Sequence, residues 1–191
     1  DMTSDNLFDS IMSAVPPRVL LGPGPSSASP RVLQAMMAPM IGYLDPDFIS
    51  IVSEVSELLR ILFHAKSGQT LALSGTGSAG MEAGLTSLLE PGDVAVICVC
   101  GFFGERMVEM ASRVDAEVVA LRSEWGKPFP VDKLEAELQT RSKVKLVAVV
   151  HAETSTGVMQ PLDELSRLAK EHDALFMVDA VTSLAGIEIA V

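Results

Sequence analysis

The residues with the clearest potential for ligand chemistry lie in the segment TLALSGTGSAGMEA, residues 70–83. Its pattern predicts a short strand over 70–73, a glycine turn, and a helix over 81–89. Such a turn leaves backbone N–H groups without acceptors at a helix N-terminus, where the helix dipole adds positive charge. Glycines allow close approach to the backbone, and Thr76 and Ser78 add hydroxyl donors. A phosphate fits these groups, and the alternative is a tight turn with a good N-cap.

A second candidate for chemistry is Asp179, which directly follows the apolar run ALFMV. A carboxylate in that position is expected to be buried, and a buried charge needs a charged or hydrogen-bonded partner. No basic residue follows it in the sequence. The cation of a ligand is therefore an attractive partner, and the alternative is an aspartate that caps the next turn.

The elements that must position these residues alternate along the chain. Helices are expected over 30–40, 47–65, 81–89, 102–114, 131–141 and 161–171. Strands are expected over 70–73, 94–99, 117–121, 145–150 and 174–178. Because the strands are apolar throughout, the pattern predicts an α/β fold with a mostly parallel sheet that helices cover on both faces.

In such sheets, ligands bind at the carboxyl ends of the strands. The segments that follow the expected strands are therefore brought to one edge: 75–78, 101–104, 151–157 and 179–183. Together they supply a possible phosphate site, the aromatic ring of Phe103, several hydroxyls and the carboxylate of Asp179. Taken alone, Phe103 fits core packing better than a ligand contact.

Composition limits the function classes. The 191 residues suit one domain, or one domain plus a tail, and 48% of them are hydrophobic. A net charge of −11 argues against nucleic-acid binding, which requires a basic face. The two cysteines, Cys98 and Cys100, would point to opposite faces of a strand and have no histidine at zinc-binding spacing, so we expect a reducing cytoplasm and no metal site. No signal peptide or membrane span is evident in the sequence.

Two kinds of cofactor match parts of the predicted site. Residues 75–80 match G-x-G-x-x-G, the dinucleotide-binding pattern, but the next strand ends in VCG without the acidic residue that binds ribose. A planar cofactor with one phosphate fits better, with the phosphate at Gly77, the ring on Phe103 and a ring nitrogen facing Asp179. These are the requirements of pyridoxal phosphate, whose ring nitrogen an aspartate keeps protonated.

The segments GPGPS, SGTGSAGMEA, EPGD, HAETSTGVMQPL and LFMVDAVTSLAG, in this order, resemble the class V aminotransferases. The resemblance runs from about residue 18 to 191 and is strongest to the alanine–glyoxylate, serine–glyoxylate and ureidoglycine–glyoxylate group. It implies a type I fold of pyridoxal phosphate-dependent transferases, with an N-terminal arm over 1–24 and an incomplete large domain over 25–191. It also implies a homodimer.

The resemblance also implies roles for individual residues. Thr76, Gly77 and Ser78 would bind the cofactor phosphate. Phe103 would stack on the ring, Thr154 would hydrogen-bond on the side of the ring hydroxyl, Val181 would pack on the other face, and Asp179 would pair with the ring nitrogen. Gly24 would lie by the substrate, and Tyr43 of the partner subunit would line the substrate pocket.

One departure from the family pattern affects the expected activity. The family's Schiff-base lysine and its substrate-binding arginine belong beyond residue 191, and no lysine of this sequence follows a strand at the ligand edge. The expected function is transfer of an amino group from a small amino acid, such as alanine or serine, to glyoxylate or another 2-oxo acid. A non-catalytic fragment that keeps the fold is one alternative, and an NAD-binding domain is the other.

Overall fold

The computed structural model describes residues 13, 15–16 and 18–189, so most of the expected N-terminal arm and residues 190–191 lie outside the described residues. The chain divides into two compact units, Asp1–Gly42 and Tyr43–Val191. In the first unit, helix α2 (Pro30–Ala35) begins after Ser29, whose hydroxyl accepts a hydrogen bond from the amide of Arg31. The division lies at 42/43, whereas the arm was expected to end at 24, and that boundary stays a prediction.

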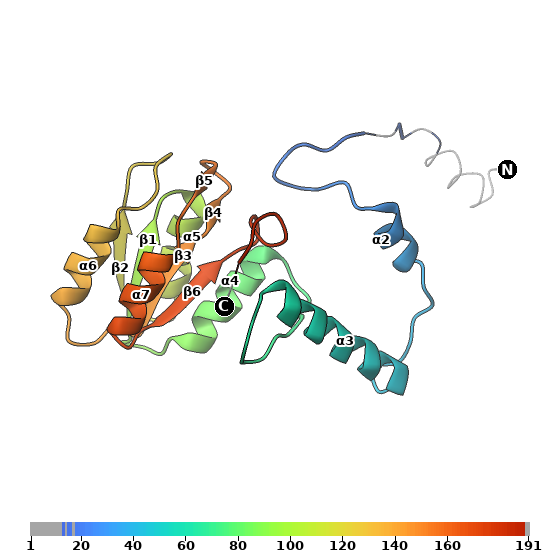
Figure 1. The fold of residues 1–191 in the computed structure, drawn as a ribbon, viewed down its shortest axis with the longest axis horizontal. Coiled ribbons are helices and arrows are strands. Elements are labelled where there is room, and N and C mark those ends of the chain that lie inside the picture. The colour runs from blue at the N-terminus through green and yellow to red at the C-terminus, as the bar shows by residue number, and fades with distance from the viewer. Residues whose placement is uncertain (1–12, 14, 17, 190–191) are drawn as a thin grey trace. The chain divides into compact units, whose positions relative to one another are not determined.

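A four-stranded parallel sheet is the centre of the second unit (Figure 1). Its order is β2 (Glu117–Arg122), β1 (Val94–Val99), β3 (Leu146–Val150), β6 (Leu175–Asp179). All three pairings are parallel, and the last one places Val150 opposite Asp179. The expected α/β fold with a mostly parallel sheet is therefore confirmed.

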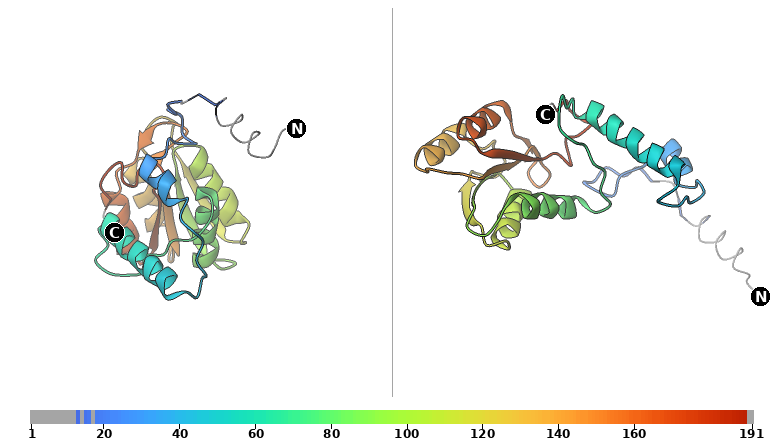
Figure 2. Two further views of the ribbon diagram at one scale, coloured as in Figure 1. Left: turned by 90° about the vertical axis from the view of Figure 1, so that its right-hand side faces the viewer. Right: turned by 90° about the horizontal axis from the view of Figure 1, so that it is seen from below.

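Helices cover both faces of this sheet, as the views in Figure 2 show. Helices α4 (Gly77–Leu88) and α5 (Phe102–Ser112) pack on one face through Leu85 and Met107. Helices α6 (Val131–Gln139) and α7 (Asp163–Glu171) pack on the other through Leu134 and Leu165. Successive residues of β1 and β3 alternate between the two cores, so both strands are apolar at nearly every position.

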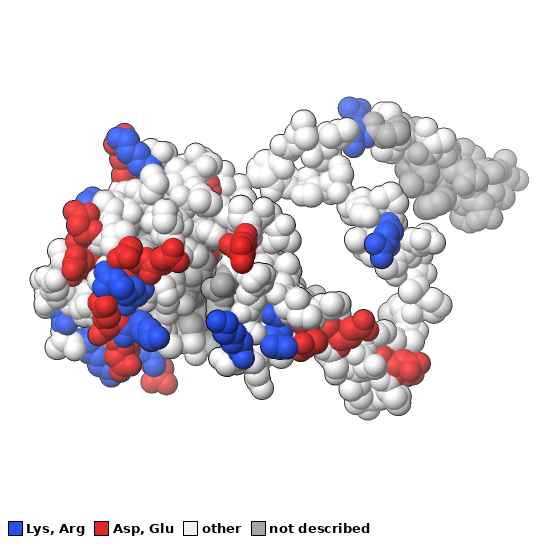
Figure 3. All heavy atoms as spheres, in the orientation of Figure 1, with Lys and Arg blue, Asp and Glu red and all other residues white. Residues whose placement is uncertain are grey.

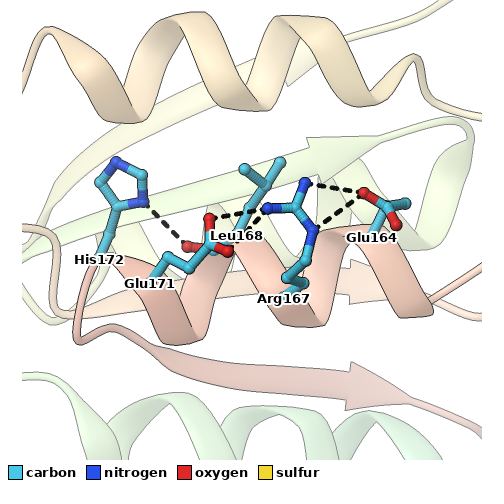
Figure 4. A network of polar contacts seen from close by, with 5 residues as sticks. All are labelled: Glu164, Arg167, Leu168, Glu171 and His172. Carbon is cyan, nitrogen blue, oxygen red and sulfur yellow. Dashed lines mark hydrogen bonds and ion pairs between the residues drawn. The ribbon is translucent and has the colours of Figure 1, made fainter.

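Charged side chains of both signs are interspersed on the solvent face of α6 and α7 (Figure 3). On α7, Arg167 lies between Glu164 and Glu171 and donates hydrogen bonds to both carboxylates (Figure 4). The ring of His172 forms a hydrogen bond with the carbonyl of Leu168. These groups are largely exposed, so the network adds to solubility more than to stability.

The sequence-based prediction of a strand over 70–73 is wrong. None of the sheet strands pairs with this segment, and Leu71 and Leu73 are exposed. An apolar run forms a strand only when a neighbouring segment supplies its backbone hydrogen bonds, and the described residues supply none here. Helix α3 (Pro46–Leu62) forms as expected, but none of its residues is buried.

A short antiparallel hairpin was not predicted. Strands β4 (Ala152–Glu153) and β5 (Val158–Met159) pair directly after β3. Gly157 closes the turn between them with a φ of 72°, a conformation that favours glycine. The hairpin lies at the carboxyl edge of the sheet and carries Glu153 and Thr154 there.

Candidate functional site

The carboxyl edge of the sheet brings together the loops that follow β3 and β6. The amide of His151 donates to the carbonyl of Asp179 over 2.9 Å, which joins the ends of the two strands. The buried His151 ring lies 3.0 Å from the hydroxyl of Ser183, so the loop after β6 is held against β3. Burial lowers the pKa of His151, which favours the neutral ring.

Helix α4 presents its N-terminus at this edge. Thr76 is the N-cap, and its hydroxyl accepts a hydrogen bond from the amide of Ala79 over 3.2 Å. Within the described part of the chain, the amides of Gly77 and Ser78 donate to no protein acceptor. Two free amides, the hydroxyls of Thr76 and Ser78, and the helix dipole make a site for an anion.

The loop after β6 lies next to that helix terminus. A methyl group added at Gly77 would lie 3.1 Å from Cγ2 of Val181, and one added at Gly84 would lie 2.8 Å from the terminal carbon of Met177. Glycine at these positions lets α4 approach β6 closely. The free amides of α4 therefore lie beside the loop that follows Asp179 and carries Val181.

Asp179 is a half-buried carboxylate that accepts a 2.9 Å hydrogen bond from the amide of Val181. Burial raises the pKa of its carboxyl group, the Val181 amide opposes that shift, and the negative charge of Glu153 adds to it. No lysine or arginine is among the groups that act on it in the described residues. This arrangement would be stabilised by a cation on a ligand.

Glu153 is a site residue that sequence reasoning missed. The residue is only 1% exposed, and its carboxylate accepts hydrogen bonds from the amides of Phe103 and Gly104, both at 3.3 Å. The signal that could have found it is the one used for Asp179, a carboxylate that closely follows a buried strand. Phe103 itself is partly buried and packs against the core beneath α4 and α5, with its ring edge-to-face to Phe102.

Thr154 lies on the hairpin side of the same edge. Its hydroxyl is 2.7 Å from that of Thr182, so the hairpin and the loop after β6 are also joined there. The predicted residues Thr76, Gly77, Ser78, Phe103, Thr154, Asp179 and Val181 thus lie on the elements that meet at this edge. Gly24 belongs to the other unit, and Tyr43 is 76% exposed in the loop before α3.

The described residues offer no group of three or more side chains suited to a metal ion. Cys98 and Cys100 are buried and unpaired, and burial raises the pKa of Cys98 to about 12, which makes it an inert thiol. Among the helices that the structure describes, none is long and apolar enough to cross a bilayer.

The fold and this edge define an α/β protein in which the free amides of a helix N-terminus lie near a carboxylate without a cationic partner among the described residues, at the carboxyl end of a parallel sheet. The family model of the class V aminotransferases matches residues 19–191, and the chain belongs to that family. This confirms the resemblance drawn from the sequence motifs.

Known proteins of this family match over most of the chain. An (S)-ureidoglycine–glyoxylate transaminase of Bacillus subtilis is 42% identical over 92% of the chain and 42% of its own length. A mouse alanine–glyoxylate aminotransferase is 39% identical over the same shares. The crystal structure of an alanine–glyoxylate aminotransferase from Nostoc sp. matches with a TM-score of 0.87 and 47% identity, over 92% of this chain and 46% of the other.

The chain thus spans less than half the length of the relatives that it matches. A second solved structure, the ureidoglycine–glyoxylate aminotransferase of Bacillus subtilis, has a TM-score of 0.89 at 40% identity and covers 93% of this chain.

Proposed function

We propose that this chain supplies the cofactor-binding part of a pyridoxal phosphate-dependent aminotransferase. The observation that carries the proposal is the half-buried Asp179 carboxylate, which has no cationic partner among the described residues, while Val181, whose amide it accepts from, lies against Gly77 at the free amides of α4. A ligand with a phosphate at one end and a protonated ring nitrogen at the other would satisfy both groups. Membership of the class V family supports the same ligand.

The residues at the edge fit this cofactor. Gly77 and Ser78 would hold its phosphate with their amides, and Thr76 and Ser78 with their hydroxyls. Asp179 would hold a proton on the ring nitrogen, because its negative charge, reinforced by Glu153, favours the protonated form of a neighbouring base. When bound, pyridoxal phosphate supplies an electron sink for chemistry at the α-carbon of an amino acid.

Three further residues are proposed as contacts of the ring. Phe103 would stack on one face, Val181 would pack on the other, and Thr154 would bond on the side of the ring hydroxyl. Thr154 is already oriented by Thr182, so its hydroxyl needs little reorganisation. Gly24 and Tyr43, the latter from a partner subunit, are proposed at the substrate pocket.

We further propose that the intact protein transfers an amino group from a small amino acid to glyoxylate or another 2-oxo acid, as a cytoplasmic homodimer. Its relatives are an (S)-ureidoglycine–glyoxylate transaminase and an alanine–glyoxylate aminotransferase, and both support glyoxylate as the acceptor. The two free, buried cysteines support a reducing compartment. The identity of the amino donor is determined by assaying a panel of amino acids.

The test is cofactor binding followed by an amino-donor panel. The intact protein is titrated with pyridoxal phosphate and, in parallel, with NAD, and then assayed with glyoxylate and alanine, serine or ureidoglycine. Cofactor binding with turnover of one donor supports the proposal. Binding of NAD without pyridoxal phosphate would favour the nucleotide-binding alternative, and cofactor binding with no turnover of any donor would favour the non-catalytic one.

A further inference from the structure

The first turn of α5 is capped by the hairpin that follows β3, rather than by its own N-cap residue. Gly101 precedes the helix and has no side chain to offer. The amide of Phe102 donates to the hydroxyl of Ser155 over 2.9 Å, and the amides of Phe103 and Gly104 donate to the two oxygens of Glu153. The next amide, that of Glu105, makes the first bond within the helix, to the carbonyl of Gly101. The first three amides of α5 have no acceptor within the helix, and all three donate to side chains that lie 49 to 53 residues further along the chain.

The capping carboxylate is itself fixed in place. Oε1 of Glu153 also accepts from the amide and the hydroxyl of Ser155, at 3.2 and 2.6 Å. Its side chain fills the space beside Gly101, since a methyl group there would lie 2.3 Å from Cγ of Glu153. These bonds hold the carboxylate in the space that the missing side chain of Gly101 leaves open. The carboxylate therefore has little freedom to move.

The first turn of α5 carries Phe103, the ring proposed to stack on the cofactor. We propose that Glu153 is a positioning residue, whose buried carboxylate fixes the first turn of α5 and thereby the height and tilt of the Phe103 ring at the cofactor site. This inference rests on the proposed function, because it assigns Glu153 a role toward the same cofactor. Glu153 has no contact with the proposed phosphate site at α4 among the bonds of the described residues.

Glu153 could act in a second way, through its charge. Its carboxylate adds to the rise in the pKa of Asp179, so the two groups interact electrostatically. A charge role and a positioning role make different predictions for the coupling between Glu153 and Phe103. Only the positioning role acts through the ring. In that case, a change at Glu153 should have no further effect on cofactor binding once the ring has been removed.

The experiment is a double-mutant cycle with Glu153→Gln and Phe103→Leu in the intact protein, titrated with pyridoxal phosphate. Each single change should weaken cofactor binding by about three- to tenfold, the range expected for a lost aromatic stack. The double variant should be no weaker than the single ones. Additive losses would overturn the positioning role and leave a charge role.

Two further readouts separate positioning from mere stability. The circular dichroism induced in the absorption band of the bound cofactor should change in shape or sign in Glu153→Gln, whereas affinity for inorganic phosphate should stay unchanged. Hydrogen exchange at the amides of Phe103 and Gly104 should quicken in the cofactor-free protein. An unchanged dichroism band together with unchanged cofactor affinity would sink the inference.

The matched control is Glu109→Gln, the same chemical change at an exposed position of α5. It should leave the dichroism band, the cofactor affinity and the exchange rates as they are. If Glu153→Gln does not fold, Ser155→Ala takes its place, because it removes only the hydroxyl between Phe102 and Glu153 and should give the same changes at smaller size. If the unchanged protein binds no pyridoxal phosphate, the proposed function fails, and exchange at α5 still tests the cap.

Discussion

The amide of Val181 donates a 2.9 Å hydrogen bond to the carboxylate of Asp179, yet burial still raises the pKa of that carboxyl group. The bond favours the ionised form, and the loss of water around the carboxylate outweighs it. In the cofactor-free protein, an ionised Asp179 therefore reduces the free energy of unfolding. A cationic ligand would reverse that effect.

The change Asp179→Asn tests this conflict between stability and function. Because the folded-state pKa is raised, the folded protein binds a proton more tightly than the unfolded chain does, and stability falls as the pH rises from about 3.8 through the raised value. The asparagine variant should lack that fall, so at pH 7 its cofactor-free form should melt at the same or a higher temperature. It should bind pyridoxal phosphate more weakly and lose at least about 100-fold in any transaminase activity.

Thermal melts from pH 3.5 to 7 without cofactor, and a cofactor titration, check both halves of this prediction. The amide oxygen of asparagine can still accept the bond from Val181, so the loop should keep its shape. A lower melting temperature together with unchanged cofactor affinity would show that Asp179 is a structural group.

How far the sequence predicts this structure depends on how local each feature is. The strands β1 and β3 were predicted within a residue, because continuous apolar runs between turn signals are typical of buried parallel strands. The segment 70–73 has the same apolar character and forms no strand, because pairing depends on a neighbour that local pattern does not reveal. The hairpin of β4 and β5 was missed because two-residue strands are too short to show periodicity.

The site shows the same limit. Asp179 and the turn at Gly77 can be proposed from the sequence because each stands out against its own neighbours. The bond between Phe103 and Glu153 joins residues 50 positions apart, so no window of sequence contains both. The local sign of this contact in the sequence is Gly101. Its lack of a side chain can be interpreted only when Glu153 is known to lie beside it.

Gly101 and Gly84 give a contrasting pair of stability predictions. At Gly101, a methyl group would meet Cγ and Cδ of Glu153 and the hydroxyl of Ser155, all within 2.6 Å, so Gly101→Ala must break the cap of α5. We expect a loss of about 2–4 kcal/mol from overpacking and unpaired donors. At Gly84, the close atom is the flexible end of Met177, and alanine also favours the helix, so Gly84→Ala should change stability by less than about 1 kcal/mol.

Urea unfolding of both variants, measured at one pH, decides this comparison. Equal losses in the two would mean that the clash at Gly101 relaxes as easily as that at Gly84. In that case the contact between Gly101 and the hairpin would not be a rigid one.

His151 predicts a distinct dependence on acid. Burial lowers its pKa, so below about pH 6.5 the unfolded chain takes up a proton that the folded protein resists. The stability that comes from the neutral ring is therefore present above that pH and is lost as the pH falls toward the lowered folded value. Replacement by asparagine, which keeps a polar atom near the hydroxyl of Ser183, should flatten the curve below about pH 6.5.

Denaturant unfolding of both proteins at several pH values measures this slope. Their difference in the free energy of unfolding at pH 8 is the internal reference, because the ring is neutral there in the folded and the unfolded state. A slope that is the same with and without His151 would assign the acid sensitivity of the protein to other groups.

Variants of Thr76 and Ser78 should separate two roles of the α4 N-terminus, which are stabilising the helix and binding the cofactor phosphate. The hydroxyl of Thr76 accepts the bond from Ala79, so Thr76→Ala should cost about 1 kcal/mol of stability and also weaken cofactor binding. The hydroxyl of Ser78 makes no bond within the described protein, so Ser78→Ala should weaken cofactor binding while leaving stability unchanged. Because both losses arise at the phosphate, neither variant should change affinity for pyridoxal, which lacks that group. Titrations with pyridoxal phosphate and pyridoxal, beside melting curves, measure all three quantities. A Ser78→Ala variant that binds both ligands as the unchanged protein does would exclude the Ser78 hydroxyl from the phosphate site, and unchanged phosphate binding in the Thr76→Ala variant as well would exclude both hydroxyls.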